Sequence, residues 1–254
     1  MQVQQSKVVK HLLKITANEL MKFNPETYAK LIKYLQQYYK LVPFREIPKE
    51  NVPYVILRHD VDVSLPRALR MAEIEHSLGV KSTYFILISS KHYNSFDGEN
   101  AVVIKRISAL GHEIGLHYDP DQYKLYSKDP AQSLKMEATV LESFIDQKVS
   151  SVSCHAPRGP RSLVQVEDYI NADDPSLRDV LVHDSERIWT IKSLTVLLND
   201  HPQRVQLLTH PCLWIGETSR RTKLDDFLLD ILLSLYRIRA LAMRLIHSKE
   251  SYEN

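Results

Sequence analysis

The sequence predicts an α/β fold built on a parallel sheet. Short apolar runs rich in β-forming residues alternate along the chain with longer segments of helical periodicity. Strands that alternate with helices in this way are joined by helical crossovers, which leave the strands parallel. Polar residues, mainly His and Asp, follow most of the apolar runs. The alternation by itself allows both an open sheet and a closed barrel.

The bulk properties are those of an ordinary globular protein. The chain has 254 residues, which suits one large domain, and we expect a single barrel domain over residues 1–254. Hydrophobic residues make up 44% and charged residues 25% of the chain, which is typical of soluble domains. The formal net charge is +2 and there is no long basic block, so we expect no nucleic-acid partner.

Cysteine usage and the N-terminal segment indicate a cytoplasmic location. Cys154 and Cys212 both lie inside apolar segments, which does not suggest a disulfide framework. Residues 1–14 lack the apolar core of a signal peptide. No stretch reaches the roughly 18 apolar residues that a membrane-spanning helix needs, so we expect no transmembrane segment.

The expected elements follow from caps, stops and periodicity. Residues 8–40 should be helical, with Asn24 and Pro25 marking a helix start inside them. Ser64 and the Asp129-Pro130 pair start later helices. Strands are expected at 54–57, 82–88, 113–117, 149–155, 180–183 and 205–209. Further helices are expected at 64–78, 101–110, 130–146, 190–199 and 222–247.

Candidate functional residues lie where these strands end. The first strand runs into residues 58–62 (Arg-His-Asp-Val-Asp), the third ends at His117 and the fourth at His155. The fifth runs into residues 183–184 (His-Asp), and the sixth ends at His210. In parallel α/β folds the carboxyl ends of the strands share one edge, where active sites form. Five strand ends of this kind therefore predict a site at that edge.

The spacing within the first of these motifs suggests a metal ion. Asp60 and Asp62 are two residues apart, so both side chains point the same way if the strand continues. Two neighbouring carboxylates repel each other unless a cation lies between them. His117 is the best imidazole ligand, and Asp121 could add an oxygen. Mixed imidazole and carboxylate ligation suits zinc or another divalent transition metal.

Simpler structural roles compete with this interpretation. Asp62 alone could be a turn or cap residue, and Asp60 could pair with Arg58 or His59. Cys154 is more often a small buried hydrophobe than a nucleophile. The coincidence of five strand ends favours the functional interpretation.

Four segments resemble the NodB-type polysaccharide deacetylases, carbohydrate esterase family four. They read RHDVD (58–62), GHEIGLHYD (111–119), SCHAPR (153–158) and LLTHP (207–211), in the order found in that family. The chain is most similar to a divergent branch with the RHDVD signature, often found beside genes of bacterial surface-polysaccharide biosynthesis. The resemblance covers about residues 54–215. It implies a distorted parallel (β/α) barrel of about seven strands, with extra N- and C-terminal helices.

The resemblance also implies roles for the strand-end residues. Asp60 matches the general base and Asp62 a metal ligand, although these two roles could be exchanged. His117 matches one metal-binding histidine, and Asp121 stands where the family has the second. His210 matches the general acid.

Other residues are candidates for supporting roles. His155 is the alternative to Asp121 as third ligand. Arg58 or Arg158 could hold Asp60 or bind an anionic substrate group. Trp214 could stack on a sugar ring or lie in the core.

The function implied is metal-dependent hydrolysis of an N- or O-acetyl group on a carbohydrate, with zinc as the expected ion. Two alternatives remain at this point. One is hydrolysis of another C–N bond, such as that of a small cyclic amide. The other is a catalytically inactive carbohydrate-binding protein. The sugar, the acyl group and the oligomeric state stay open.

Overall fold

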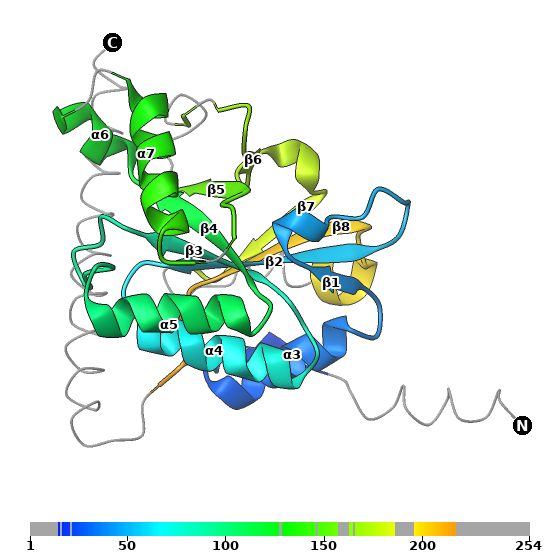
Figure 1. Ribbon diagram of the computed structural model, residues 1–254. Coiled ribbons are helices and arrows are strands. Elements are labelled where there is room, and N and C mark those ends of the chain that lie inside the picture. Colours follow the sequence, from blue (N-terminus) through cyan, green and yellow to red (C-terminus); the bar gives the residue numbers. More distant parts are fainter. Residues whose placement is uncertain are drawn as a thin grey trace, which may run out of the picture. The chain divides into compact units, whose positions relative to one another are not determined.

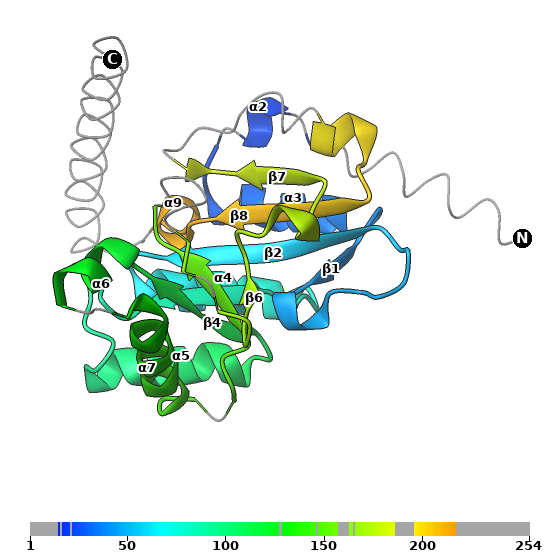
Figure 2. The ribbon, with the colours of Figure 1, turned by 90° about the horizontal axis from the view of Figure 1, so that it is seen from above.

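In the computed structural model, parallel strands form one sheet that curls into a half-barrel (Figures 1 and 2). Seven strands lie in the order β6-β5-β4-β3-β2-β8-β7, and each neighbouring pair is parallel. An eighth, β1, pairs with the start of β2. The strands are β1 (Lys40–Val42), β2 (Tyr54–Val61), β3 (Thr83–Leu87), β4 (Glu113–Tyr118), β5 (Ser151–Cys154), β6 (Ile170–Asn171), β7 (Val180–His183) and β8 (Arg204–Thr209). This confirms the predicted distorted barrel of about seven strands.

The structure describes residues 15, 17–20, 22–126, 129–145, 147–156, 163–164, 166–185 and 196–216. The chain divides into two compact units, 1–215 and 216–254, and all described residues except Gly216 belong to the first. The helix expected at 222–247 lies outside the described residues, and the single-domain assignment stays a prediction. No helix in the described part of the chain is long and apolar enough to cross a bilayer.

The helices begin at the residues that the sequence marks as caps. Asn24, Ser64 and Asp129 each accept a hydrogen bond from a backbone N–H in the first turn of the helix that follows. Gly79 ends one of these helices with a φ of +69°, a conformation that favours glycine. The helices are α2 (Ala17–Leu20), α3 (Pro25–Leu35), α4 (Leu65–Ser77), α5 (Gly98–Ala109), α6 (Pro120–Tyr126), α7 (Pro130–Glu142) and α9 (Pro211–Trp214). Short 3₁₀ turns lie at Phe44–Glu46 and Pro175–Leu177, and a π-helical turn at Val196–Asp200.

Some expected boundaries were wrong. The first strand continues to Val61 instead of ending at Leu57, because its charged residues are paired inside the barrel. The helical segment 8–40 is interrupted before Asn24, and β1 begins at Lys40. The strands β1 and β6 were not predicted, since three and two residues are too short to show a periodicity. Of the helix expected at 190–199, only residues from Val196 onward are described.

The two faces of the sheet carry different side chains. Helices α3, α4 and α5 cover the outer face (Figures 1 and 2), where alternate strand residues such as Tyr84 and Ile86 join the larger apolar core. The intervening residues, such as Ile56 and Phe85, point into the half-barrel and form a smaller core with Phe44.

One buried carboxylate ties the helical layer to the sheet. Glu75 of α4 is fully buried, and its Oε1 accepts a hydrogen bond from Tyr28 of α3 at 2.6 Å and lies 2.8 Å from His59 Nε2. Its Oε2 accepts hydrogen bonds from Ser82 at 2.6 Å and Tyr84 at 2.7 Å. Although burial by itself would raise the pKa of Glu75, His59, His112 and the Ser82 hydroxyl lower it to about 2.

The Glu75→Gln variant should lose roughly 3 kcal/mol of unfolding free energy, because an amide donor would face hydroxyl donors in a buried site. A carboxylate with a lowered pKa contributes stability that is present above its unfolded value of 4.5 and is lost as the pH falls toward about 2. Denaturant unfolding between pH 2 and 7 measures both effects.

Glu73→Gln is the matched control on the same helix. Glu73 is exposed and pairs with Arg106 at 2.8 Å, so Glu73→Gln should lower the unfolding free energy by less than about 1 kcal/mol. Equal losses for the two variants would contradict the structural role given to Glu75.

Candidate active site

The carboxyl ends of five parallel strands converge at one mouth of the half-barrel. Strand β2 leads into Asp62, β4 contains His117 near its end, and β5 leads into His155. On the other side of β2, β7 leads into Asp184 and β8 into His210. Ion-pair distances of 2.6–3.8 Å link these groups around Asp62 and His210. The predicted convergence of strand-end residues is therefore present in the fold.

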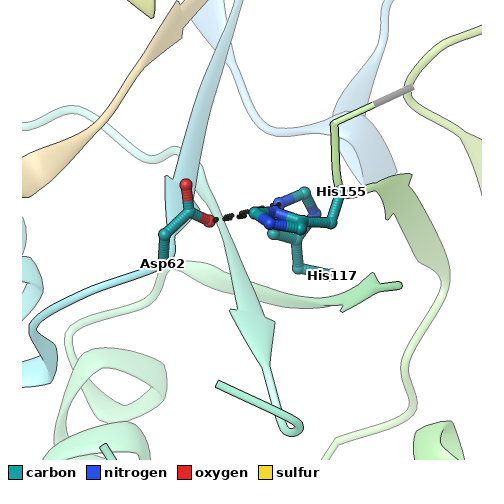
Figure 3. Close-up of side chains that lie close together, drawn as sticks. All are labelled: Asp62, His117 and His155. Carbon is teal, nitrogen blue, oxygen red and sulfur yellow. Dashed lines mark hydrogen bonds and ion pairs between the residues drawn. The ribbon is translucent and has the colours of Figure 1, made fainter. Parts of the chain in front are cut away.

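Asp62, His117 and His155 form a compact group with metal-ligand chemistry (Figure 3). One ligand atom from each lies within 4.8 Å of the other two. Asp62 Oδ1 is 3.2 Å from His117 Nε2 and 3.7 Å from His155 Nδ1, and the two ring nitrogens are 3.2 Å apart. Two imidazoles and one carboxylate, with a remaining position for water, are the ligand set of many catalytic zinc sites.

The hydrogen bonds around this group fit a bound cation. Asp62 Oδ1 is buried and has no hydrogen-bond partner among the described residues. His117 Nδ1 lies 3.0 Å from the Ser153 carbonyl, so Nδ1 carries the proton and the Nε2 lone pair faces Asp62. An unpartnered carboxylate oxygen beside an aimed lone pair is what a divalent ion would satisfy.

The pKa shifts in the group differ from residue to residue. Burial lowers the pKa of His155, which favours the neutral ring that binds metals. Burial alone would also lower the pKa of His117, but Asp60 and Asp62 raise it. Burial alone would raise the pKa of Asp62, but His117, His210 and His155 hold it well below its usual value. The carboxylate is thus ionised beside imidazoles that are positioned to share a cation.

A turn after β5 aims His155 at this group. The His155 N–H donates to the Tyr118 carbonyl at 2.8 Å, which extends the β4–β5 pairing by one residue. Ala156, the next residue, has a φ of +46°, which costs a non-glycine residue roughly 1 kcal/mol. Strain of this kind is commonly retained where a side chain must be held for function.

Asp121, the other candidate for third ligand, does not join this group. It lies on α6, its side chain is 44% exposed, and its Oδ1 accepts a hydrogen bond from Lys124 Nζ at 2.8 Å. The unpredicted helix α6 turns the chain away after β4, so the i and i+4 residues of the motif do not point to one place. His155, the alternative that the sequence left open, lies beside Asp62 and His117 instead.

Asp60 is held by Arg58 inside the barrel. Arg58 Nε and Nη2 each donate to one Asp60 oxygen at 2.9 Å, and both side chains are almost fully buried. Arg58 Nη1 donates to Asp173 at 2.9 Å, and Nη2 also bonds to the Ser153 hydroxyl. Burial alone would raise the pKa of Asp60, but Arg58 and then His117 lower it. Of the two expected roles for Arg58, holding Asp60 is the one its contacts support.

His210 and Asp184 form a second unit at the mouth. Asp184 Oδ1 accepts a hydrogen bond from His210 Nδ1 at 2.6 Å, and Oδ2 accepts from the His210 backbone N–H at 2.9 Å. His210 Nε2 is then directed toward Asp62 and lies 3.8 Å from its Oδ2. Burial alone would lower the pKa of His210, but Asp184 raises it to about 9. The ring is therefore a protonated donor at neutral pH.

Trp214 lies in the core, which is the second of the two roles that the sequence allowed. The side chain is fully buried, its Nε1 donates to Asp184 Oδ2 at 2.7 Å, and its ring packs against Phe23 and Tyr28. Arg158, the other candidate for contact with substrate, lies outside the described residues.

Three residues that support the site had no assigned role in the sequence. Asp184 follows a predicted strand, so its position was visible, but its bonds to His210 and Trp214 were not. Asp173 accepts hydrogen bonds from Arg58 and from the Cys154 N–H, and Ser153 contacts Arg58. Asp173 lies in an irregular connection, where no periodicity could indicate it.

Comparisons with known proteins find similar solved structures only at low identity. No protein-family model and no curated protein matches the chain. A CE4 family pseudoenzyme from Bacillus anthracis is 21% identical over 74% of this chain and 62% of that chain, with a TM-score of 0.44. A family 4 carbohydrate esterase from the same species is 16% identical over 83% of this chain and 86% of that chain, with a TM-score of 0.44.

A third similar structure is the catalytic domain of a peptidoglycan N-acetylglucosamine deacetylase from Eubacterium rectale. It is 13% identical over 65% of this chain and 79% of that chain, with a TM-score of 0.47. The chain is thus similar to carbohydrate esterase family 4 structures. It spans 62% of the length of the pseudoenzyme.

In the metal-free protein, His210 should titrate at about 9, and Asp184→Asn should bring this pKa down because the buried anion is removed. A raised histidine pKa contributes stability that is complete below 6.5 and is lost as the pH rises through about 9. NMR titration of the His210 ring measures the pKa, and thermal unfolding from pH 6 to 10 measures the change in stability.

Asp179→Asn serves as the control, since Asp179 lies next to the opposite end of β7 and pairs with exposed Arg204 at 2.7 Å. An unchanged His210 pKa in Asp184→Asn would show that Asp184 does not set its charge.

Proposed function

We propose that this protein is a metal-dependent hydrolase that removes an N- or O-acetyl group from a carbohydrate. The observation that carries the proposal is the Asp62–His117–His155 group with its unpartnered Asp62 Oδ1. An ionised carboxylate, Asp60, and a protonated imidazole, His210, flank the same mouth. A ligand set, a base and an acid around one point are the parts that metal-assisted acyl hydrolysis requires.

Asp62, His117 and His155 would hold a divalent ion, with zinc expected, which would polarise the acyl carbonyl and lower the pKa of bound water. Asp60 is placed to accept the proton of the attacking water. Its Oδ2 is 3.8 Å from His117 Nε2 and, beyond its bond to Arg58, keeps a second lone pair. Arg58 keeps the carboxylate oriented and ionised.

His210 is placed to donate a proton to the leaving amine or alkoxide. Asp184 fixes the ring through Nδ1, so Nε2 faces the mouth and is the nitrogen that can release a proton there. After the transfer, the buried Asp184 carboxylate favours reprotonation of the ring. Asp60 and His210 thus approach Asp62 from different strands and take opposite proton-transfer roles.

The carbohydrate substrate and a place in bacterial surface-polysaccharide biosynthesis rest on the motif resemblance. Cys154 and Cys212 are both buried, and the cytoplasmic location remains a prediction from the sequence. Hydrolysis of another C–N bond remains the alternative within enzymes. The second alternative is an inactive carbohydrate-binding protein, which was motivated by the missing histidine at position 121. The position of His155 beside Asp62 and His117 supports the metal site over this alternative.

The test of the function is incubation of the protein with a panel of acetylated sugars and, in parallel, with cyclic amides. Only the sugars should be hydrolysed, with release of acetate, and the release should stop on addition of chelator.

Asp62→Asn should lower zinc affinity by more than roughly 100-fold and abolish acetate release, since it removes a ligand. Asp121→Asn is the matched control and should leave zinc affinity and acetate release unchanged. Loss of zinc in Asp121→Asn but not in Asp62→Asn would contradict the ligand assignment.

His210→Ala should lower kcat by roughly 10²–10⁴-fold with a smaller change in KM, because a general acid acts on the transition state. His76→Ala, on the exposed side of α4, is the control. Steady-state kinetics on the best acetylated sugar measures the effect, and an unchanged kcat would remove His210 from the mechanism.

A further inference from the structure

Asp62 lies just beyond regular secondary structure. Strand β2 ends at Val61, whose register partner on β3 is Ile86, and α4 starts at Leu65. The Asp62 backbone therefore belongs to a three-residue connection and lacks the strand pairing that holds Asp60. A metal ligand must be held within about 0.5 Å, so other contacts have to fix this residue.

The hydroxyl of Tyr93 links the two strands just past their last register pair. It donates to the Val61 carbonyl at 2.6 Å and accepts from the Leu87 N–H at 3.1 Å. Tyr93 comes from the connection between β3 and α5, residues 88–97. A single hydroxyl therefore bridges the backbone groups of the two strands at this point.

Ser90 of the same connection holds the next peptide group. Its Oγ donates to the Asp62 carbonyl at 2.8 Å and accepts the His92 N–H at 3.1 Å. Its own N–H donates to the Leu87 carbonyl at 3.1 Å, which anchors it to the end of β3. The carbonyls on both sides of the Asp62 N–Cα–C unit are therefore fixed by hydroxyls from one loop.

Neither hydroxyl uses the Asp62 carboxylate as its acceptor. Both donate to backbone, so the carboxylate stays directed at His117 and His155. Burial, and then the negative charge of Asp62, raises the pKa of Tyr93 well above its usual value, so the phenol remains a donor at any working pH.

We propose that Tyr93 and Ser90 are positioning residues that set the metal affinity of the Asp62–His117–His155 group by fixing the Asp62 backbone. The proposal rests on the metal site of the proposed function, and it assigns the β3–α5 connection a role in that site. Partners that orient a ligand without touching the metal typically change metal affinity by about 10–100-fold.

Tyr93→Phe tests this directly, because it removes one oxygen and leaves the ring. Zinc affinity is measured by competition with a chromophoric chelator, and site geometry by the visible absorption spectrum of the cobalt(II)-loaded protein. Tyr93→Phe should weaken zinc binding by roughly 10-fold and alter the cobalt spectrum. Ser90→Ala should act in the same direction, and Ser90→Thr, which keeps the hydroxyl, should restore the wild-type values.

Tyr34→Phe is the matched control. The Tyr34 hydroxyl likewise donates to a backbone carbonyl, that of Leu198 at 3.0 Å, but Tyr34 lies on α3 and makes no contact with the site. Thermal unfolding of the metal-free variants should show comparable losses of stability for Tyr34→Phe and Tyr93→Phe. Only Tyr93→Phe should change zinc affinity, which separates positioning from general destabilisation.

Wild-type zinc affinity and cobalt spectra in both Tyr93→Phe and Ser90→Ala would overturn the proposal and leave the hydrolase intact. If Tyr93→Phe fails to fold, the Ser90→Ala and Ser90→Thr pair decides by the same readouts. A wild-type protein that binds no divalent ion would overturn this proposal and the metal site together, whereas zinc binding without acetate release would overturn only the proposed function.

Discussion

Burial of charge inside the half-barrel is the constraint on which the site depends. A carboxylate removed from water costs several kcal/mol unless a partner compensates it. Arg58 supplies two parallel hydrogen bonds to Asp60 from the same strand, and Asp173 and Ser153 occupy its other donors. Because these charges are satisfied, β2 continues as a strand to Val61, which places Asp62 at the mouth.

Strand β2 carries site residues on its inner face and contacts with the helical layer on its outer face. Arg58 and Asp60 point into the half-barrel, while His59 between them points outward to Glu75 and to Thr209, which lies 2.7 Å from its Nδ1. The outer contacts bind α3, α4 and β3 to β2, so the strand that carries Asp60 is fixed on its helical face. The inner face is thereby free to present polar groups.

Two groups of strands contribute different chemistry to one carboxylate. From one side of β2, His117 and His155 approach Asp62 Oδ1. From the other side, His210, which follows β8, approaches Oδ2, and Asp184 after β7 holds its ring. The three histidines differ in their partners: a backbone carbonyl keeps His117 aimed, burial keeps His155 neutral, and a buried carboxylate keeps His210 protonated. His117 and His155 are therefore suited to bind a metal on one side of Asp62, and His210 is suited to donate a proton on the other.

Local signals in the sequence determined the parallel α/β class, most strand positions and the caps at Asn24, Ser64 and Asp129, because these depend on periodicity and neighbouring residues. They also placed Asp60, Asp62, His117 and His210 at one edge, since parallel strands must end together. Tertiary structure alone placed His155, and not Asp121, beside Asp62 and His117, because helix α6 sets the direction of the chain after β4. It alone revealed Asp173, the burial of Trp214 and the hydroxyls of Tyr93 and Ser90 behind Asp62, since these contacts join segments whose approach no local pattern encodes.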